Sequence, residues 1–291
     1  MKKLKSLFSV AVVLLATVVF AACGAPSYEK LTVNYTSGLE FLVGEDYSDA
    51  NVTAKATLSD GSTEDVTSKL TINTSEYNKN TMAKYKIYFE FEGMKESCEV
   101  SVVDRITTSS IINDRFAKVI NNTFGNGAYS FEMTEVTEID TNTYTTQTIK
   151  QTVDASGNIV SYVKWVVTMG SENVTIYEKW YTGTATSGEC VDGVEEETTA
   201  VSFSEFNDKI ALDAASAGAY LGDAVVLLPG NVYDLKANTQ TLTGELTKAG
   251  DVYTLTSDST YTYVNNVLTS INGVDVTFGQ ATIPAVPELT A

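Results

Sequence analysis

The chain has 291 residues, of which 43% are hydrophobic, and its formal net charge is −18. This length and apolar content suffice for one large or two small domains and exclude a disordered acidic tail. The sequence holds no histidine and only three cysteines. It therefore excludes Ser-His-Asp and Cys-His catalysis and every zinc site that needs histidine.

Residues 1–22 have the charge and hydropathy pattern of an export signal. Three lysines within the first five residues precede an apolar run over residues 7–22, which is shorter than the roughly 20 residues that span a membrane. The run ends in Phe-Ala-Ala-Cys at residues 20–23 and resembles the lipobox of bacterial lipoproteins. This resemblance implies that Cys23 is diacylated, that residues 23–29 form the anchor and a short linker, and that the protein lies on the extracytoplasmic face of a bacterial cell membrane. An ordinary secretory signal with an incidental Cys23 is the alternative.

Acidic residues are spread over the whole exported part of the chain. A surface of this sign repels phosphates, so we expect no nucleic-acid partner. The best local cluster for calcium is Asp192 with Glu195, Glu196 and Glu197, but it lacks the alternating oxygen ligands of a calcium loop. We therefore predict no metal site and no cofactor.

The two cysteines beyond residue 23 are expected to be free thiols. Cys98 alternates with polar residues in a strand-like run, which predicts a side chain in a core. Cys190 lies in a stretch rich in glycine and acid, which we interpret as an exposed loop. A core strand and a loop in different domains are poor disulfide partners.

Residues 30–104 read as a succession of short strands. Apolar and polar residues alternate over residues 31–35, 52–58, 85–91 and 97–103, and turn residues lie between these runs. About seven antiparallel strands with one apolar face each predict a β-sandwich.

Part of this domain also resembles a known family. Residues 41–47, Phe-Leu-Val-Gly-Glu-Asp-Tyr, and residues 58–62, Leu-Ser-Asp-Gly-Ser, look like the turn and strand end of bacterial immunoglobulin-like domains. The tyrosine-containing hairpin over residues 85–103 fills the closing position of that family. The resemblance covers roughly residues 28–104 and implies a stalk or adhesive module without catalytic residues.

Residues 105–291 follow a different plan. Ser109 and Ser110 are candidate caps of a helix whose apolar side is Ile111, Ile112, Phe116, Val119, Ile120 and Phe124. Long alternating runs follow up to residue 181, a second helix is predicted from Ser204 toward Tyr220, and hairpins occupy residues 242–278. We expect nine or ten strands and two helices.

This order of elements resembles the lipoprotein-carrier fold of LolA-like proteins, and residues 276–284 look like the closing strand of such small lipoproteins. The resemblance implies a curved antiparallel sheet, or half-barrel, that wraps about two helices. Its concave face would hold acyl chains. The predicted fold class is therefore mainly β, with an immunoglobulin-like β-sandwich followed by this curved sheet.

Catalytic groups are not evident. Phosphate-binding glycine loops and the Gly-x-Ser-x-Gly motif are absent, and Glu178 is a weak candidate for an acid on an apolar strand face. Aromatic residues on adjacent predicted strands are the best candidate ligand surface, where rings would stack on sugars or line an acyl cavity. They are Trp165, Tyr177, Trp180, Tyr181, Tyr253, Tyr261 and Tyr263. Ordinary cross-strand packing is the alternative.

The leading hypothesis is a lipid-anchored, non-enzymatic surface protein whose second domain binds a hydrophobic or amphipathic ligand. An adhesin or cell-envelope module that recognises glycan or protein is the second hypothesis. A glycan hydrolase that uses only acids is the third.

Overall fold

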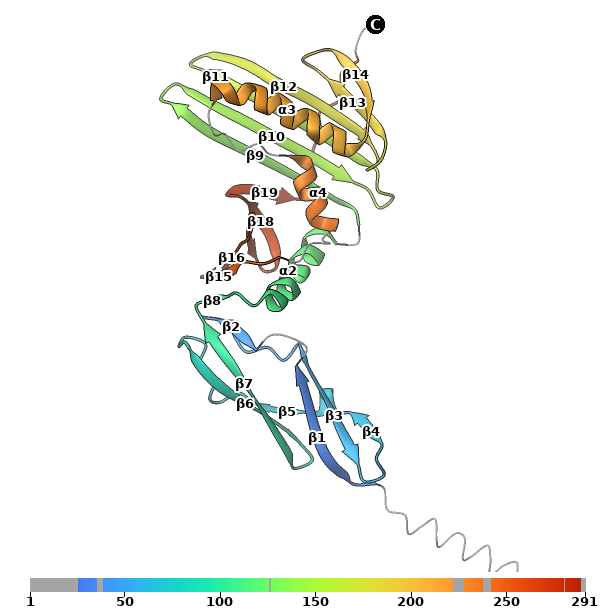
Figure 1. The fold of residues 1–291 in the computed structure, drawn as a ribbon, viewed down its shortest axis with the longest axis vertical. Helices are drawn as coiled ribbons and strands as arrows, with labels where there is room; N and C mark the ends of the chain where they lie inside the picture. Colours follow the sequence, from blue (N-terminus) through green and yellow to red (C-terminus); the bar gives the residue numbers. More distant parts are fainter. Residues whose placement is uncertain are drawn as a thin grey trace, which may run out of the picture. The chain divides into compact units, whose positions relative to one another are not determined.

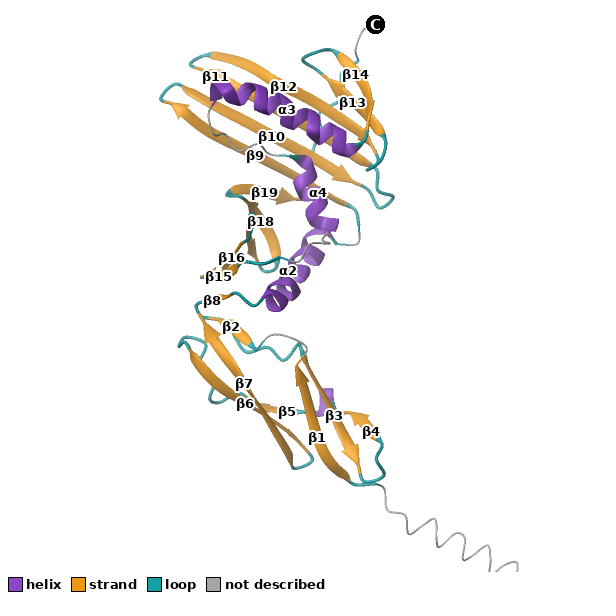
Figure 2. Cartoon of the chain, viewed as in Figure 1, coloured by secondary structure: helices purple, strands orange, loops and turns teal. Residues whose placement is uncertain are grey.

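The computed structural model describes residues 26–35, 39–125, 127–221, 228–237, 242–279 and 281–288. The chain divides into two compact units between Asp104 and Arg105, and strands dominate both (Figure 2). Among these residues, no helix is long and apolar enough to cross a membrane. The predicted signal and Cys23 lie outside the described residues.

The first unit is a β-sandwich of two sheets (Figure 1). One sheet has the order β1-β3-β4 and the other β2-β7-β6-β5. The strands are β1 (Tyr28–Tyr35), β2 (Glu40–Leu42), β3 (Val52–Leu58), β4 (Thr63–Asp65), β5 (Thr71–Asn73), β6 (Ala83–Phe91) and β7 (Met94–Val103). One pairing corrects the expectation of a purely antiparallel sandwich, because β2 runs parallel to β7. The chain leaves the first sheet after β1 and joins the second at β2, beside the last strand.

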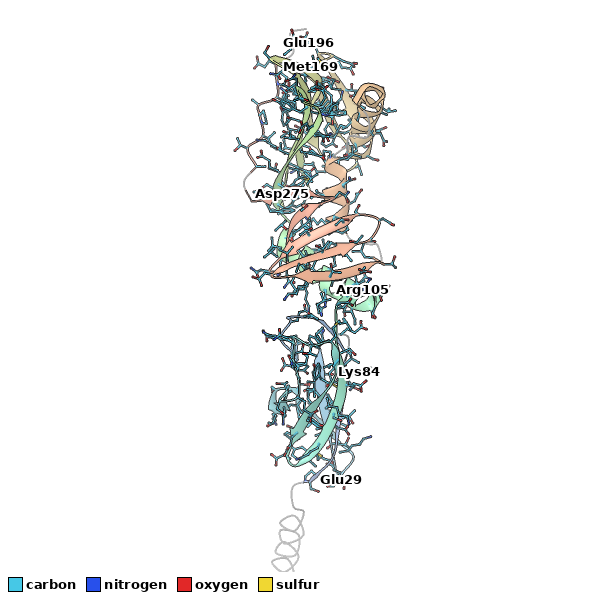
Figure 3. All side chains as sticks on the ribbon, turned by 90° about the vertical axis from the view of Figure 1, so that its left-hand side faces the viewer. Glu29, Lys84, Arg105, Met169, Glu196 and Asp275 are labelled. Atoms are coloured by element: carbon cyan, nitrogen blue, oxygen red, sulfur yellow. The ribbon has the colours of Figure 1, made fainter. Side chains whose placement is uncertain are left out.

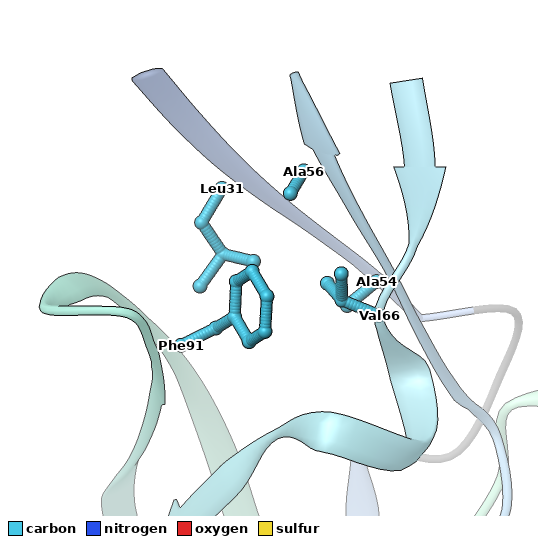
Figure 4. Packing of buried hydrophobic residues seen from close by; sticks show 5 residues of the cluster. All are labelled: Leu31, Ala54, Ala56, Val66 and Phe91. Carbon is cyan, nitrogen blue, oxygen red and sulfur yellow. The ribbon is translucent and has the colours of Figure 1, made fainter. Parts of the chain in front are cut away.

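Alternation along the strands builds the core between these two sheets. In β3, Val52, Ala54 and Ala56 are buried, whereas Thr53 and Lys55 are exposed. Figure 4 shows the alanines of this strand beside a larger pair of side chains, Leu31 and Phe91. Small residues on one strand thus make room for an aromatic ring from the other sheet.

The second unit is built on one antiparallel sheet of twelve strands that curls into a half-barrel. Their order is β14-β13-β12-β11-β10-β9-β19-β18-β17-β16-β15-β8. The strands are β8 (Arg105–Ile106), β9 (Tyr129–Asp140), β10 (Thr143–Val153), β11 (Ile159–Met169), β12 (Glu172–Gly183), β13 (Gly188–Asp192), β14 (Glu197–Val201), β15 (Glu245–Ala249), β16 (Val252–Thr256), β17 (Thr260–Val264), β18 (Val267–Ile271) and β19 (Val274–Phe278). Nine or ten strands are expected from the sequence, and the strands without a counterpart among the predicted runs are β8 and the hairpin β13–β14.

Three α-helices accompany the sheet within the described residues. The six predicted apolar residues of α2 (Ser109–Phe124) are all buried. Its N-cap is Thr108, without a hydrogen bond from a capping side chain, so the predicted caps at Ser109 and Ser110 are wrong.

The helix α3 (Phe203–Leu221) lies across the long strands in Figure 1 and packs on β12. Ser202 and Glu205 form a reciprocal capping box at its start: the Glu205 carboxylate accepts the Ser202 N–H at 2.7 Å, and the Ser202 hydroxyl oxygen accepts the Glu205 N–H at 3.3 Å. These two bonds satisfy backbone groups that the first turn leaves open.

The third helix, α4 (Pro229–Ala237), is additional to the two helices expected from the sequence. Proline suits a first helical turn, because its N–H is not needed there and its φ angle is already helical. The backbone N–H of Gly230 donates to Asn207 Oδ1 at 2.8 Å, which ties this turn to α3.

Candidate functional site

An apolar groove lies at the end of the long strands of the second unit. It has a volume of about 390 Å³, within the range of roughly 300 to 1,000 Å³ that is typical of small-molecule sites. Six of its lining side chains are apolar and two are polar. They are Ile139, Val167, Met169, Val174, Ile176, Ala217, Asp140 and Thr143.

The groove residues come from two hairpin ends and one helix. The β9–β10 and β11–β12 hairpins bring their turns to the same end of the sheet, where Figure 3 labels Met169. Ala217, on α3, adds the helical wall. Because hairpin turns are usually polar, apolar side chains gathered beside them are unusual.

An irregularity in β12 decides which side chains share this face. Trp165 lies opposite Tyr177 and Val167 lies opposite Val174, so the register skips Ile176. Since Trp165 and Val167 are two residues apart on β11, their opposite residues face the same side of the sheet. Val174 and Tyr177 therefore face the same side, although strict alternation would place them on opposite faces.

The groove side chains are partly open to solvent. The exposed fractions are 46% for Met169, 45% for Val174 and 39% for Ile139. Burial of such apolar surface by a ligand contributes about 25 cal/mol of favourable free energy for each Å² removed from water. The arrangement is chemically suited to a hydrocarbon chain.

A buried ionic cluster lies beneath α3 on the same face of the sheet. The Lys179 ammonium, on β12, contacts the carboxylate of Asp192. It also contacts the carboxylate of Asp213 on α3, with 2.9 Å between Nζ and Oδ2. Burial alone would lower the pKa of Lys179, but hydrogen bonds from its ammonium to the two carboxylates outweigh burial and raise it. Burial likewise would raise the pKa of Asp192, but the hydrogen bond from Lys179 and the backbone N–H groups of residues 194 and 195 leave it below its ordinary value. Lys179 and Asp192 are therefore both charged near neutral pH.

The aromatic residues predicted as a ligand surface lie mostly in the interior. Trp165, Tyr177 and Tyr181 are at most 2% exposed on the face toward α3, and the phenol of Tyr177 accepts a hydrogen bond from the Gln147 amide. Tyr181 packs against Phe203 and Phe206 of α3. These rings pack in the interior because the helix covers this face.

The remaining predicted rings are separate from the groove. Trp180 is 6% exposed, and its indole N–H donates to the carbonyl oxygen of Pro284 at 3.1 Å. Tyr263 is buried and stacks on Tyr253 with ring centroids 5.1 Å apart, whereas Tyr261, half-buried, packs against Phe116 of α2. The structure thus does not assemble the predicted residues into one surface.

The partners of Glu178 are a tyrosine and a lysine on the neighbouring strand. Its carboxylate accepts the Tyr162 hydroxyl at 2.8 Å and pairs with Lys164 at 3.1 Å. Desolvation of the Tyr162 hydroxyl raises its pKa, and the neighbouring Glu178 carboxylate adds to the effect. This pairing is typical of a structural cross-strand contact and not of the two-acid arrangement of glycosidases.

The acidic segment around Asp192 forms a hairpin. Asp192 Oδ1 accepts the backbone N–H groups of Val194 and Glu195, at 2.9 and 3.1 Å, and so closes the β13–β14 turn. Across the described residues, no group of three or more acids or cysteines is placed to hold a metal ion. The interpretation of Cys190 as part of an exposed loop is wrong. It lies in β13 opposite Tyr181 of β12 and is buried. Cys190 and the half-buried Cys98 are both free thiols, as predicted.

A second, more polar hollow of about 290 Å³ lies between the N-terminal turns of α3 and α4. The Asn207 amide in its wall is engaged at both ends, because its Nδ2 donates to the Phe203 carbonyl at 2.6 Å and its Oδ1 accepts the Gly230 N–H. Asp208 and Asp234 also line it, and both are exposed.

Sequence reasoning missed the groove residues, although a signal was present. Ile139, Met169 and Val174 are apolar residues that flank the turns of the β9–β10 and β11–β12 hairpins. Such positions are normally polar, so their apolar character pointed to a site. Comparison with known proteins gives no matching family model, no matching curated protein and no matching solved structure.

Proposed function

We propose that the chain is a non-enzymatic, lipid-anchored bacterial surface protein whose second unit binds a hydrophobic or amphipathic ligand in the groove described above. The single observation that supports ligand binding is this groove of about 390 Å³, with six apolar lining residues. The anchor is proposed from the lipobox-like sequence that ends at Cys23. In this proposal the first unit is the spacer between anchor and binding unit.

The energetics of the groove favour a chain-like apolar ligand. A micromolar complex requires about 8 kcal/mol. At about 0.8 kcal/mol for each methylene removed from water, about ten methylenes supply this before the entropic cost of association. A single alkyl chain meets this requirement, whereas a sugar has little apolar surface to bury.

Native mass spectrometry tests the binding proposal. Residues 24–291, which include every described residue, are expressed and purified without detergent. We expect a co-purifying lipid mass that is lost in Val174→Asp, because this substitution places a charge in the groove. Substitutions at Trp165 or Trp180 are unsuitable, since a charge at either buried ring would disrupt folding.

The matched control is Val136→Asp. Val136 is 62% exposed and lies opposite Thr146, on the face of the sheet away from the groove. We expect this variant to keep the lipid. A lipid-free wild type that binds glycans saturably would contradict the proposal in favour of an adhesin, and turnover of a polysaccharide would contradict both.

The anchor is tested separately in cells with an alkyne-labelled fatty acid. We expect the wild type to take up label and to fractionate with the membrane, and Cys23→Ala to do neither. Two buried acyl chains suffice for stable anchoring, so loss of the cysteine should release the protein. Continued labelling of the variant would disprove lipidation at this residue.

A further inference from the structure

We propose that the ligand of the groove is a single-chain amphiphile with a cationic amine head group, and that Asp140 is the residue that selects it. This inference rests on the proposed function, because it specifies the ligand of the same groove. It is carried by the charges on and around the groove.

Asp140 is the one charged side chain among the described residues that line the groove. It ends β9, and its Oδ1 accepts the backbone N–H of Asn142 at 2.9 Å. This hydrogen bond holds the pKa of the carboxyl below its ordinary value. Asp140 is therefore a fixed negative charge at the polar end of an otherwise apolar groove.

The neighbouring charges have the same sign. Asp213 lies one helical turn before Ala217 on α3, and Glu135 lies on β9 opposite Gln147, on the face toward α3. One carboxylate oxygen of Glu135 is shielded from solvent and has no hydrogen-bond partner, and burial raises the pKa of this group. Asp213 is paired with Lys179 and Glu135 does not line the groove, so Asp140 is the acid that a cationic head group in the groove would meet.

Basic side chains near the groove are already committed. Among the described strand residues that face α3, Lys179 is the one cation, and it contacts both Asp192 and Asp213. Lys164 pairs with Glu178 and Lys150 pairs with Glu132, and both lysines lie on the opposite face of the sheet. An anionic head group, such as a carboxylate or a phosphate, would find repulsion at Asp140 and no available ammonium in the groove wall.

The expected selectivity follows from the binding free energy that a solvent-accessible ion pair contributes. Such a pair strengthens binding by up to about fivefold, and repulsion of an anion weakens it by a similar factor. The two factors multiply, so a cationic amphiphile should bind up to about 25-fold more tightly than an anionic one with the same chain, and added salt should reduce this difference.

Calorimetric titration of residues 24–291 with decylammonium, decanol and decanoate at pH 7, below their aggregation concentrations, tests the inference. We expect the affinities to fall in that order. Asp140→Asn keeps an oxygen that accepts the Asn142 N–H and removes the charge, so the preference for decylammonium should fall to about twofold or less. The matched control is Glu138→Gln, because Glu138 lies opposite Tyr144 on the other face of β9 and the preference should survive there.

The outcomes separate this inference from the proposed function. Equal binding of the three probes, or a preference that Asp140→Asn leaves unchanged, overturns the cationic specificity while groove binding stands. Loss of preference in Glu138→Gln as well overturns the role of Asp140 and indicates a general effect of net charge. Failure of all three probes to bind overturns both proposals.

Discussion

Replacement of Lys179 by methionine should destabilise the second unit severely. The side chains of Lys179 and Asp192 are only 6% and 5% exposed, and the ammonium contacts a second carboxylate from α3. Methionine preserves most of the aliphatic stem but removes the charge. Asp192 on β13 then remains buried without its cation, and Asp213 on α3 loses its partner.

The magnitude follows from the burial of the ion pair. Removal of one partner from a buried pair costs about 3–5 kcal/mol, because the remaining charge is left desolvated and unpaired. For a unit of this size, about 2–4 °C in melting temperature corresponds to each kcal/mol. We therefore expect Lys179→Met to lower the melting temperature by about 6–20 °C.

Tryptophan fluorescence during urea unfolding measures this effect in the second unit alone. The chain has two tryptophans, Trp165 on β11 and Trp180 on β12, so the signal contains no contribution from tryptophan in the first unit. The matched control is Lys164→Met. Lys164 is 34% exposed and pairs with the 25% exposed Glu178, so its loss should cost less than about 1 kcal/mol.

The pH dependence provides an independent test. Because the pKa of Asp192 is depressed in the native state, its stabilisation is present above the unfolded pKa of about 3.9 and is lost as the pH falls through the lower native value. Because the pKa of Lys179 is raised, its stabilisation is lost only as the pH rises above about 10.4. In Lys179→Met the buried Asp192 carboxylate has lost its cation and gains from protonation, so the difference from wild type should shrink between pH 7 and pH 4. A difference below about 1 kcal/mol at pH 7, or one that does not change with pH, would refute the reasoning.

Three further substitutions have defined outcomes. Ala54→Val adds volume beside Phe91 in a fully buried site, and it should destabilise the first unit by about 1–3 kcal/mol, measured by tyrosine near-ultraviolet circular dichroism in urea. Gly273→Ala forces a side chain onto a φ of +84° and should cost about 1 kcal/mol in the fluorescence assay. Trp180→Phe removes the indole hydrogen bond to Pro284 and should accelerate carboxypeptidase trimming of the C-terminal segment; an unchanged rate would show that this bond does not hold the segment.

Local patterns along the chain predicted most of the individual elements. In α2 the spacing of the apolar residues identified all six buried side chains, because a helix presents every third or fourth residue to its core. In β3 the alternation identified the buried alanines for the analogous reason in a strand. The prediction failed for β13, where glycine and acidic residues suggested a loop. Asp192 can be buried in this strand because Lys179, on the neighbouring strand, pairs with it, and this contact is not visible in the local sequence.

The candidate site depended on features that local patterns do not contain. The skipped Ile176 in the β11–β12 register turns Val174 to the same face as Tyr177, and strict alternation predicts the opposite. The burial of Trp165 and Tyr181 depends on where α3 packs, which is a long-range contact.

The sequence alone determined that the chain is mainly β, that its plan changes at residue 105, and that histidine chemistry is absent. These properties depend on composition and on periodicity within a few residues. Only the tertiary structure decided which aromatic rings are covered and which apolar side chains stay open in a groove. The physical reason is that exposure depends on what packs against a face, and the helix that covers this sheet begins at Phe203, 20 residues after the end of β12 at Gly183.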